Sequence, residues 1–209
     1  MEQKPYKTVR AAGVAEHIER HSRFIAYVYP CQSEEQALIY IDEVRQKHPD
    51  ATHHVHAYTL KNGIVRRFFD DGEPKGTAGL PVIDVLTKQE LEDALVVVVR
   101  YFGGILLGAG GLVRAYSQAA RLGILAAGVC EMESCGVYSF AVGYAFFERV
   151  KLLLEQLSGD ILTTEFGGDI TVECVLPDDK LTDFTQKLED VIHDSVKICR
   201  IKDVFRPKS

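Results

Sequence analysis

The sequence predicts an α+β protein built from two domains. Its 209 residues are enough for one large domain or two small ones with a sizeable core. Hydrophobic residues make up 46% of the chain and charged residues 26%, which is typical of a globular protein and excludes a disordered one. The last part of the chain has a complete β-α-β-β-α-β order, the split-βαβ or ferredoxin-like unit. We therefore expect one domain over residues 1–135 and a second over 136–209, without a long linker.

The first domain should open with two strands and a capped helix. Residues 6–10 and 24–29 are predicted strands, and Gly13 is the turn signal between them. The serine and glutamine of segment 33–36 have the spacing of a capping box, and apolar residues at helical intervals follow. This helix should run to about His48, because the proline after it disfavours further helix.

A hairpin should come next. Residues 53–60 alternate as a strand does, Asn62-Gly63 is a strong signal for a hairpin turn, and residues 64–69 supply the second strand. The pattern then predicts a loop rich in glycine and proline, a short helix and a strand covered on both faces, over residues 70–81, 82–86 and 95–99.

A glycine-rich segment, Gly103–Gly111, comes next in the first domain and leads into a helix over 112–127. Residues 128–136 are expected to be a connector, and the second domain should begin with a strand at Val137. The remaining pattern predicts a helix (146–157), a strand, a turn (167–168), a strand (170–176), a helix (179–192) and a strand (196–204).

The glycine-rich segment has two interpretations. It fits neither the dinucleotide-binding fingerprint nor the P-loop, because the required third glycine falls on Val113 and no Gly-Lys-Ser/Thr follows a glycine run. Backbone N–H groups of a glycine loop that opens a helix can still bind an anion, and Arg100 and Arg114 flank this loop. Arg121 shares a helix face with Arg114. Alternatively, the glycines only allow close packing of the helix on the sheet.

The loop after the predicted hairpin gathers three carboxylates, a lysine and a hydroxyl: Asp70, Asp71, Glu73, Lys75 and Thr77. Paired acids can bind a metal ion or share a proton, and His54 with His56 on one strand face could complete such a site. No spacing here equals a known metal fingerprint, so we predict neither a metal nor another cofactor. The alternative is a solvated turn with capping acids.

Charge and cysteine content limit the compartment and the partners. Lys and Arg number 24 against 30 Asp and Glu, a formal charge of -6, so tight binding to bulk nucleic acid is disfavoured. Residues 1–135 are the less acidic part, with 15 basic and 17 acidic groups. Five scattered cysteines argue against a disulfide framework and favour a reducing cytosol. The first residues have no secretory signal pattern, no apolar run could span a membrane, and a cytoplasmic protein is expected.

Two long motifs carry a family resemblance. Residues 70–79 and 98–116 closely resemble the YigZ/IMPACT family, and Thr52-His53-His54 stands where that family has a histidine-bearing strand. The resemblance implies that the first domain has the fold of the second domain of small-subunit ribosomal protein five. It also implies a second domain similar to the ferredoxin-like domain five of elongation factor G. The resemblance further implies a link to translation, since eukaryotic members regulate translation under amino-acid starvation through an extra N-terminal domain, which we do not expect in this chain.

Two hypotheses about function follow. The first is a non-enzymatic regulatory protein of translation that binds RNA, the ribosome or another phosphate-bearing ligand, and has a regulatory protein partner. The alternative is an enzyme on a small phosphorylated or anionic substrate that uses the acidic loop. Because no catalytic motif is complete, we favour binding over catalysis. The residues expected at the ligand or nucleic-acid site are His54, Asp70, Asp71, Glu73, Lys75, Thr77, Arg100, Tyr101, Phe102, Gly103, Gly104, Gly108, Gly110, Gly111, Arg114 and Arg121.

Overall fold

The computed structural model describes residues 5–60 and 64–208 and separates the chain into two compact units. The first unit spans Tyr6–Glu131 and the second begins at Met132. Each unit contains its own sheet and its own buried core, so the predicted α+β class and two-domain architecture are confirmed. The predicted Asn62-Gly63 turn lies outside the described residues.

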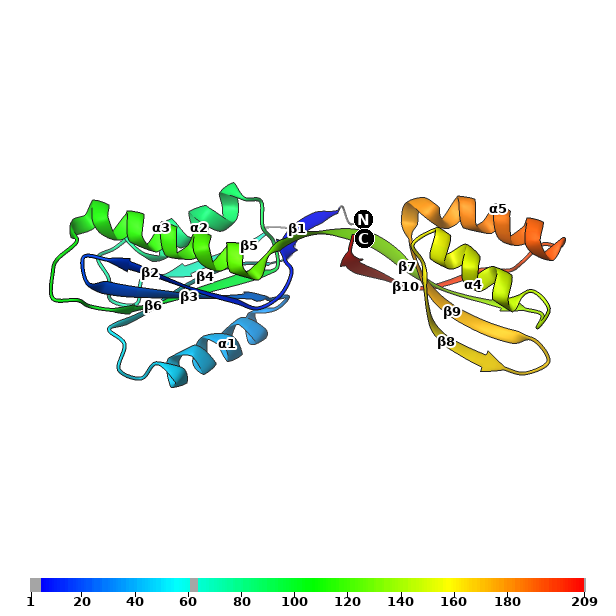
Figure 1. Cartoon of the computed structure of the whole chain (residues 1–209), viewed down its shortest axis with the longest axis horizontal. Coiled ribbons are helices and arrows are strands. Elements are labelled where there is room, and N and C mark those ends of the chain that lie inside the picture. Colours follow the sequence, from blue (N-terminus) through cyan, green and yellow to red (C-terminus); the bar gives the residue numbers. More distant parts are fainter. Residues whose placement is uncertain (1–4, 61–63, 209) are drawn as a thin grey trace. The chain divides into compact units, whose positions relative to one another are not determined.

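The first unit is built on an antiparallel sheet of order β2-β3-β6-β4-β5. Its strands are β2 (Gly13–Glu19), β3 (Ser22–Pro30), β4 (His53–Leu60), β5 (Val65–Phe69) and β6 (Ala94–Tyr101). Helices α2 (Gly79–Lys88) and α3 (Gly108–Ala127) cover one face, and α1 (Glu34–Lys47) covers the other (Figure 1). The central strand β6 is therefore buried on both sides, which explains its unbroken run of apolar residues.

The start of the chain differs from the sequence prediction. Strand β1 (Tyr6–Val9) is as expected, but Gly13 begins β2 instead of forming the turn. The tight turn joins β2 to β3 at Arg20 and His21, whose φ angles are 44° and 65°. Positive φ at both central residues suits the twist of a hairpin, yet neither residue is the glycine or asparagine that would have signalled it. Gly13 instead allows close packing, since a Cβ there would lie 2.3 Å from the backbone nitrogen of Ala127.

Side chains support the starts of α1 and α2, and the starts of α2 and α3 differ from the sequence prediction. In α1, Ser33 Oγ accepts the N–H of Gln36 at 3.2 Å, as the capping box predicts. Helix α2 begins at Gly79, three residues earlier than expected, because the Asp70 carboxylate accepts its first N–H groups. Helix α3 begins at Gly108 instead of 112, so Arg114 lies in the second turn and not in the first.

The second unit has the predicted β-α-β-β-α-β order. Its elements are β7 (Val129–Val142), α4 (Phe147–Gln156), β8 (Asp160–Phe166), β9 (Ile170–Pro177), a 3₁₀ turn (Asp178–Lys180), α5 (Leu181–Ile192) and β10 (Cys199–Pro207). In its sheet β9 and β10 pair with β7, and β8 pairs with β9, all antiparallel. The core lies between this sheet and the two helices, where the rings of Phe140 and Phe184 are in contact.

The expected connector over 128–136 is wrong, because residues 129–142 form one continuous strand. Its first half alternates: Cys130 and Met132 are buried, whereas Val129 and Glu131 are exposed. This period of two is the strand signature, and the glycine just before it at 128 ends α3 with a φ of 70°. The final strand was also expected three residues too early.

Two properties concern the chain as a whole. All five cysteines are free thiols. Among the residues that the structure describes, no helix combines the length and apolar character needed to cross a bilayer.

Candidate functional site

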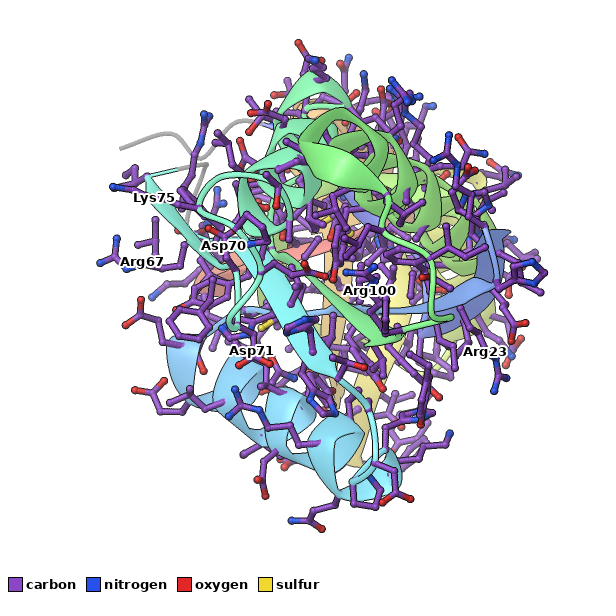
Figure 2. All side chains as sticks on the ribbon, turned by 90° about the vertical axis from the view of Figure 1, so that its left-hand side faces the viewer. Arg23, Arg67, Asp70, Asp71, Lys75 and Arg100 are labelled. Carbon is purple, nitrogen blue, oxygen red and sulfur yellow. The ribbon has the colours of Figure 1, made fainter. Side chains whose placement is uncertain are left out.

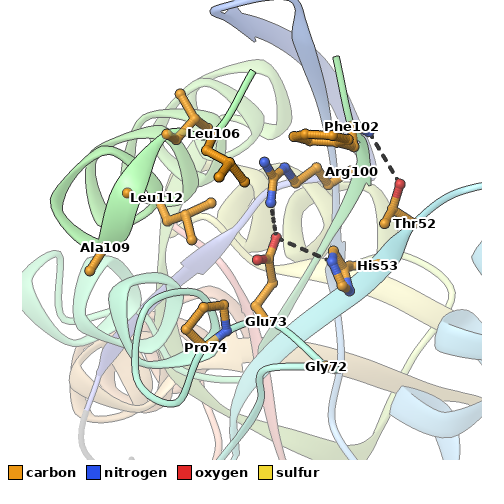
Figure 3. A pocket seen from close by; sticks show the side chains of 12 residues that line it. Thr52, His53, Gly72, Glu73, Pro74, Arg100, Phe102, Leu106, Ala109 and Leu112 are labelled. Carbon is orange, nitrogen blue, oxygen red and sulfur yellow. Dashed lines mark hydrogen bonds and ion pairs between the residues drawn. The ribbon is translucent and has the colours of Figure 1, made fainter. Parts of the chain in front are cut away.

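A pocket of about 390 Å³ opens in the first unit beside the N-terminal end of α3 (Figure 3). Three segments form its walls: the start of β4, the turn that follows β5, and the stretch from the end of β6 to the start of α3. Of the sequence-predicted site residues, those lining it are Glu73, Arg100, Phe102 and Gly108. The acidic loop and the glycine-rich segment thus contribute to one pocket.

The floor of this pocket is a buried ion pair between Glu73 and Arg100. Arg100 Nη1 donates to Glu73 Oε1 at 2.6 Å. The side chain of Arg100 is only 6% exposed and that of Glu73 only 3%. The hydroxyl of Tyr116 donates to the same oxygen at 2.7 Å. A guanidinium in such a buried position needs a negative partner, and here the chain itself supplies it. The burial of Arg100 is thus explained without a bound anion, and its role in anion binding stays a prediction.

Two aromatic rings and a serine surround the guanidinium. Its central carbon lies 5.4 Å from the ring centre of Phe24 and 5.6 Å from that of Phe102. Nη2 is 3.5 Å from Ser22 Oγ, while buried Nε has no hydrogen-bond partner within residues 5–60 and 64–208. Figure 2 shows Arg100 inside the unit, whereas Arg23 and Arg67 extend at its periphery. Arg100 is thus positioned by the fold as part of the pocket floor.

The two oxygens of the Glu73 carboxylate have different surroundings. Oε1 receives the hydrogen bonds of Arg100 and Tyr116 and lies 3.7 Å from His53 Nε2. Oε2 has no hydrogen-bond partner in the described part of the chain, and in Figure 3 the second oxygen points to the side of Leu112, into the pocket. Burial and then the charge of Glu73 raise the pKa of Tyr116, which therefore remains a donor at neutral pH.

His53 is the second titratable group that faces the pocket. Its Nδ1 lies 2.8 Å from the backbone oxygen of Asp71, and because a carbonyl oxygen only accepts, Nδ1 must carry a hydrogen. This contact directs Nε2 towards Glu73. At 3.7 Å the two atoms are close enough for an ion pair but beyond hydrogen-bond distance.

The other two acids of the loop do not line the pocket. Asp70 accepts three backbone N–H groups at the start of α2, from Gly76, Ala78 and Gly79. Asp71 accepts the N–H of His54 at 2.6 Å. A turn with positive φ at residues 71 and 72 separates these acids from Glu73, which alone points inward. Within the described ranges no three His, Cys, Asp or Glu side chains are grouped to hold a metal ion.

Arg114 lies next to the pocket without lining it. Its Nη1 is 3.7 Å from the position that a Cβ on Gly110 would take, so the side chain folds back over the first turn of α3. Arg114 is exposed and forms no ion pair with any residue in the described ranges. Arg121 is also exposed, but it lies two turns further along the helix.

The remaining predicted residues have other positions. Tyr101 and His54 contact His48 on the α1 side of the sheet, through bonds of 2.8 Å to its Nδ1 and 3.0 Å to its carbonyl oxygen. Thr77 donates to the Pro74 carbonyl oxygen, and Lys75 extends into solvent. The pocket wall does not include Gly103, Gly104, Gly110 or Gly111. A Cβ on Gly103 would lie 2.1 Å from the carbonyl carbon of residue 21, which favours the packing interpretation for that glycine.

The sequence reasoning missed eight lining residues: Thr52, His53, Gly72, Pro74, Leu106, Leu107, Ala109 and Leu112. It also missed Tyr116. A signal existed for His53, because the period of two puts it on the strand face of Val55 and Ala57, opposite to His54. Tyr116 shares a helix face with Leu112, four residues earlier.

The fold and the pocket define a two-domain α+β protein with a small, mostly apolar binding pocket in its first domain. The profile of the Impact N-terminal domain matches residues 20–124, and that of a domain of unknown function, DUF1949, matches residues 140–194. The chain is 32% identical to IMPACT family member YvyE of Bacillus subtilis, over 89% of this chain and 86% of the relative. It is 33% identical to IMPACT family member YigZ of Escherichia coli, over 91% of this chain and 94% of the relative.

A crystal structure of a hypothetical protein is also similar, with a TM-score of 0.63 and 30% identity over 96% of this chain and 98% of that one. The chain therefore belongs to the IMPACT family, as the resemblance of its two motifs predicted.

Proposed function

We propose that this protein is a translation-associated regulatory protein whose first domain binds structured RNA, as found in the ribosome. The RNA contacts the start of α3 and the pocket beside it. Family membership supports the link to translation, because the eukaryotic relatives that the sequence resembles regulate translation. The glycine-rich start of α3 supports RNA as the ligand class.

The observation that carries the proposal is the position of Arg114. Its guanidinium folds back over Gly110, in the turn where α3 leaves its first backbone N–H groups without helical partners. No side chain caps this end of the helix. The N–H groups, the helix dipole and an unpaired guanidinium together form a positive site for one phosphate group.

The pocket floor does not add to this positive site, since Glu73 neutralises Arg100. Phosphate binding is therefore confined to the helix start, in agreement with the acidic charge of the whole chain. Few phosphate contacts mean a modest salt dependence and a preference for a shaped target over bulk nucleic acid.

Arg114→Ala tests this proposal, with Arg121→Ala as the matched control on the same helix. Loss of Arg114 should weaken binding to ribosomal RNA fragments by about 1–3 kcal/mol, the scale of a charged hydrogen bond. It should also reduce the slope of log affinity against log salt by about one. Fluorescence anisotropy measures both quantities, and thermal melts with and without phosphate or RNA separate binding from stability.

Arg121→Ala should change affinity far less. Equal losses in the two variants, or binding that salt does not weaken, would contradict RNA contact at the start of α3. Co-sedimentation with ribosomes from growing and starved cells tests the translation part of the proposal independently.

Catalysis on a small phosphorylated substrate is the second candidate function. The proximity of His53 and Glu73 favours it, because an imidazole and a carboxylate in one pocket can act as acid and base. Turnover of a phosphorylated metabolite, abolished by His53→Ala, would support this candidate over binding alone.

A further inference from the structure

One carboxylate oxygen of Glu73 is free to accept hydrogen bonds from an occupant of the pocket. Glu73 Oε2 accepts no hydrogen bond from any residue in the described ranges, although the side chain is only 3% exposed. This oxygen is not among the fully buried side-chain atoms that lack a partner, so it can be reached from the pocket, and an ionised carboxylate oxygen is a strong acceptor. An occupant of the pocket that carries N–H groups would satisfy this oxygen.

The walls of the pocket suit a flat ring. Phe102 is 45% exposed and its ring stacks over the Arg100 guanidinium, so one face of the ring is already supported from below. Leu106 and Leu112 face it across the pocket (Figure 3). Exposed aromatic rings of this kind bind unpaired bases by stacking.

A phosphate site lies next to this ring site. Gly108 and Ala109 line the pocket and belong to the first turn of α3, and the guanidinium of Arg114 folds back over this turn from the second one. An occupant that reaches both places has a flat ring with N–H donors and a nearby phosphate group. This combination is the chemistry of a nucleotide.

We infer that the pocket holds an unpaired guanine of the bound RNA, whose N1–H and N2–H groups donate to Glu73. The inference rests on the proposed function and specifies the base at the same site. The guanine ring stacks on Phe102, and a neighbouring phosphate contacts the start of α3.

Guanine is favoured because a carboxylate only accepts hydrogen bonds. Guanine has two adjacent donors on its Watson–Crick edge. Adenine and cytosine have an acceptor nitrogen next to their amino group, and uracil has carbonyl oxygens on both sides of its single N–H. Those acceptors would face the lone pairs of Glu73, which is repulsive.

The test compares RNAs of one sequence in which a single guanosine is kept, or is replaced by inosine, adenosine or an abasic site. The full chain should bind the guanosine RNA about tenfold more tightly than the adenosine or abasic RNA. Inosine should be intermediate, because it keeps N1–H and lacks the amino group.

Phe102→Ala should weaken binding of the guanosine RNA about tenfold and remove the preference for guanosine. Its control is Ile105→Ala, since Ile105 is 44% exposed in the same loop and does not line the pocket. Glu73→Gln should remove the preference as well. If Glu73→Gln does not fold, the comparison of Phe102→Ala with Ile105→Ala still tests the guanine inference.

Equal affinity for all four RNAs, with binding that still depends on salt and on Arg114, would overturn the guanine inference and leave the proposed function intact. Absence of RNA binding would overturn the proposed function. In that case guanosine monophosphate is titrated alone: binding that Phe102→Ala abolishes supports the guanine pocket, and no binding overturns it.

Discussion

The buried pair between Glu73 and Arg100 should contribute far more to stability than an exposed pair of the same length. Glu73→Gln leaves the Arg100 guanidinium, 6% exposed, without a negative partner. Removing one member of a buried pair usually lowers the free energy of unfolding by about 3–5 kcal/mol, because the other charge remains buried. We expect a loss in this range.

The chain offers a matched control in Arg23 and Glu16. Their atoms are 2.7 Å apart, against 2.6 Å in the buried pair, but the side chains are 53% and 39% exposed. Water screens such a pair, which usually contributes about 0.2–1 kcal/mol. Glu16→Gln should therefore change the free energy of unfolding by no more than this amount.

Urea unfolding followed by circular dichroism measures both variants, and Arg100→Met completes a double-mutant cycle with Glu73→Gln. The double variant should lose less free energy of unfolding than the sum of the two single variants, because it no longer contains a buried charge without a partner. Similar small losses for Glu73→Gln and Glu16→Gln would refute the assignment of a strong buried pair. Additive losses in the cycle would refute it as well.

Two further predictions concern stability. Asp70→Ala should lower the free energy of unfolding by about 1–2 kcal/mol, because the carboxylate caps α2. Asp70→Asn should lose less stability, since its side-chain oxygen can still accept a hydrogen bond. Urea unfolding measures both variants, and an unchanged stability of Asp70→Ala would contradict the capping role. Burial lowers the pKa of His48 and His56 from 6.5, so the unfolded chain takes up protons first as the pH falls below about 6.5. Stability should be highest above that pH and lower at pH ~5.5; equal stability at pH ~7.5 and ~5.5 would contradict this.

Local patterns in the sequence were sufficient for most helices and strands. The capping box before α1 acts through neighbouring residues, Ser33 and Gln36, and the structure has the predicted hydrogen bond. The β-α-β-β-α-β order of the second domain follows from hydrophobic periods of two and 3.6, which are also local. The hairpin turn at Arg20 and His21 was missed because its positive φ angles occur at residues without a turn preference.

The sequence alone determined that three acids and two arginines belong to two motifs of one family, and that both motifs flank turns or helix starts. It did not determine which acid faces which arginine. Asp70, Asp71 and Glu73 are chemically similar neighbours, and only the backbone turn at Asp71 and Gly72 directs Glu73 inward. Its partners Arg100 and Tyr116 are 27 and 43 residues away in the chain. Such contacts depend on how the sheet and α3 pack, so only the tertiary structure decided that Glu73 neutralises Arg100 on the pocket floor.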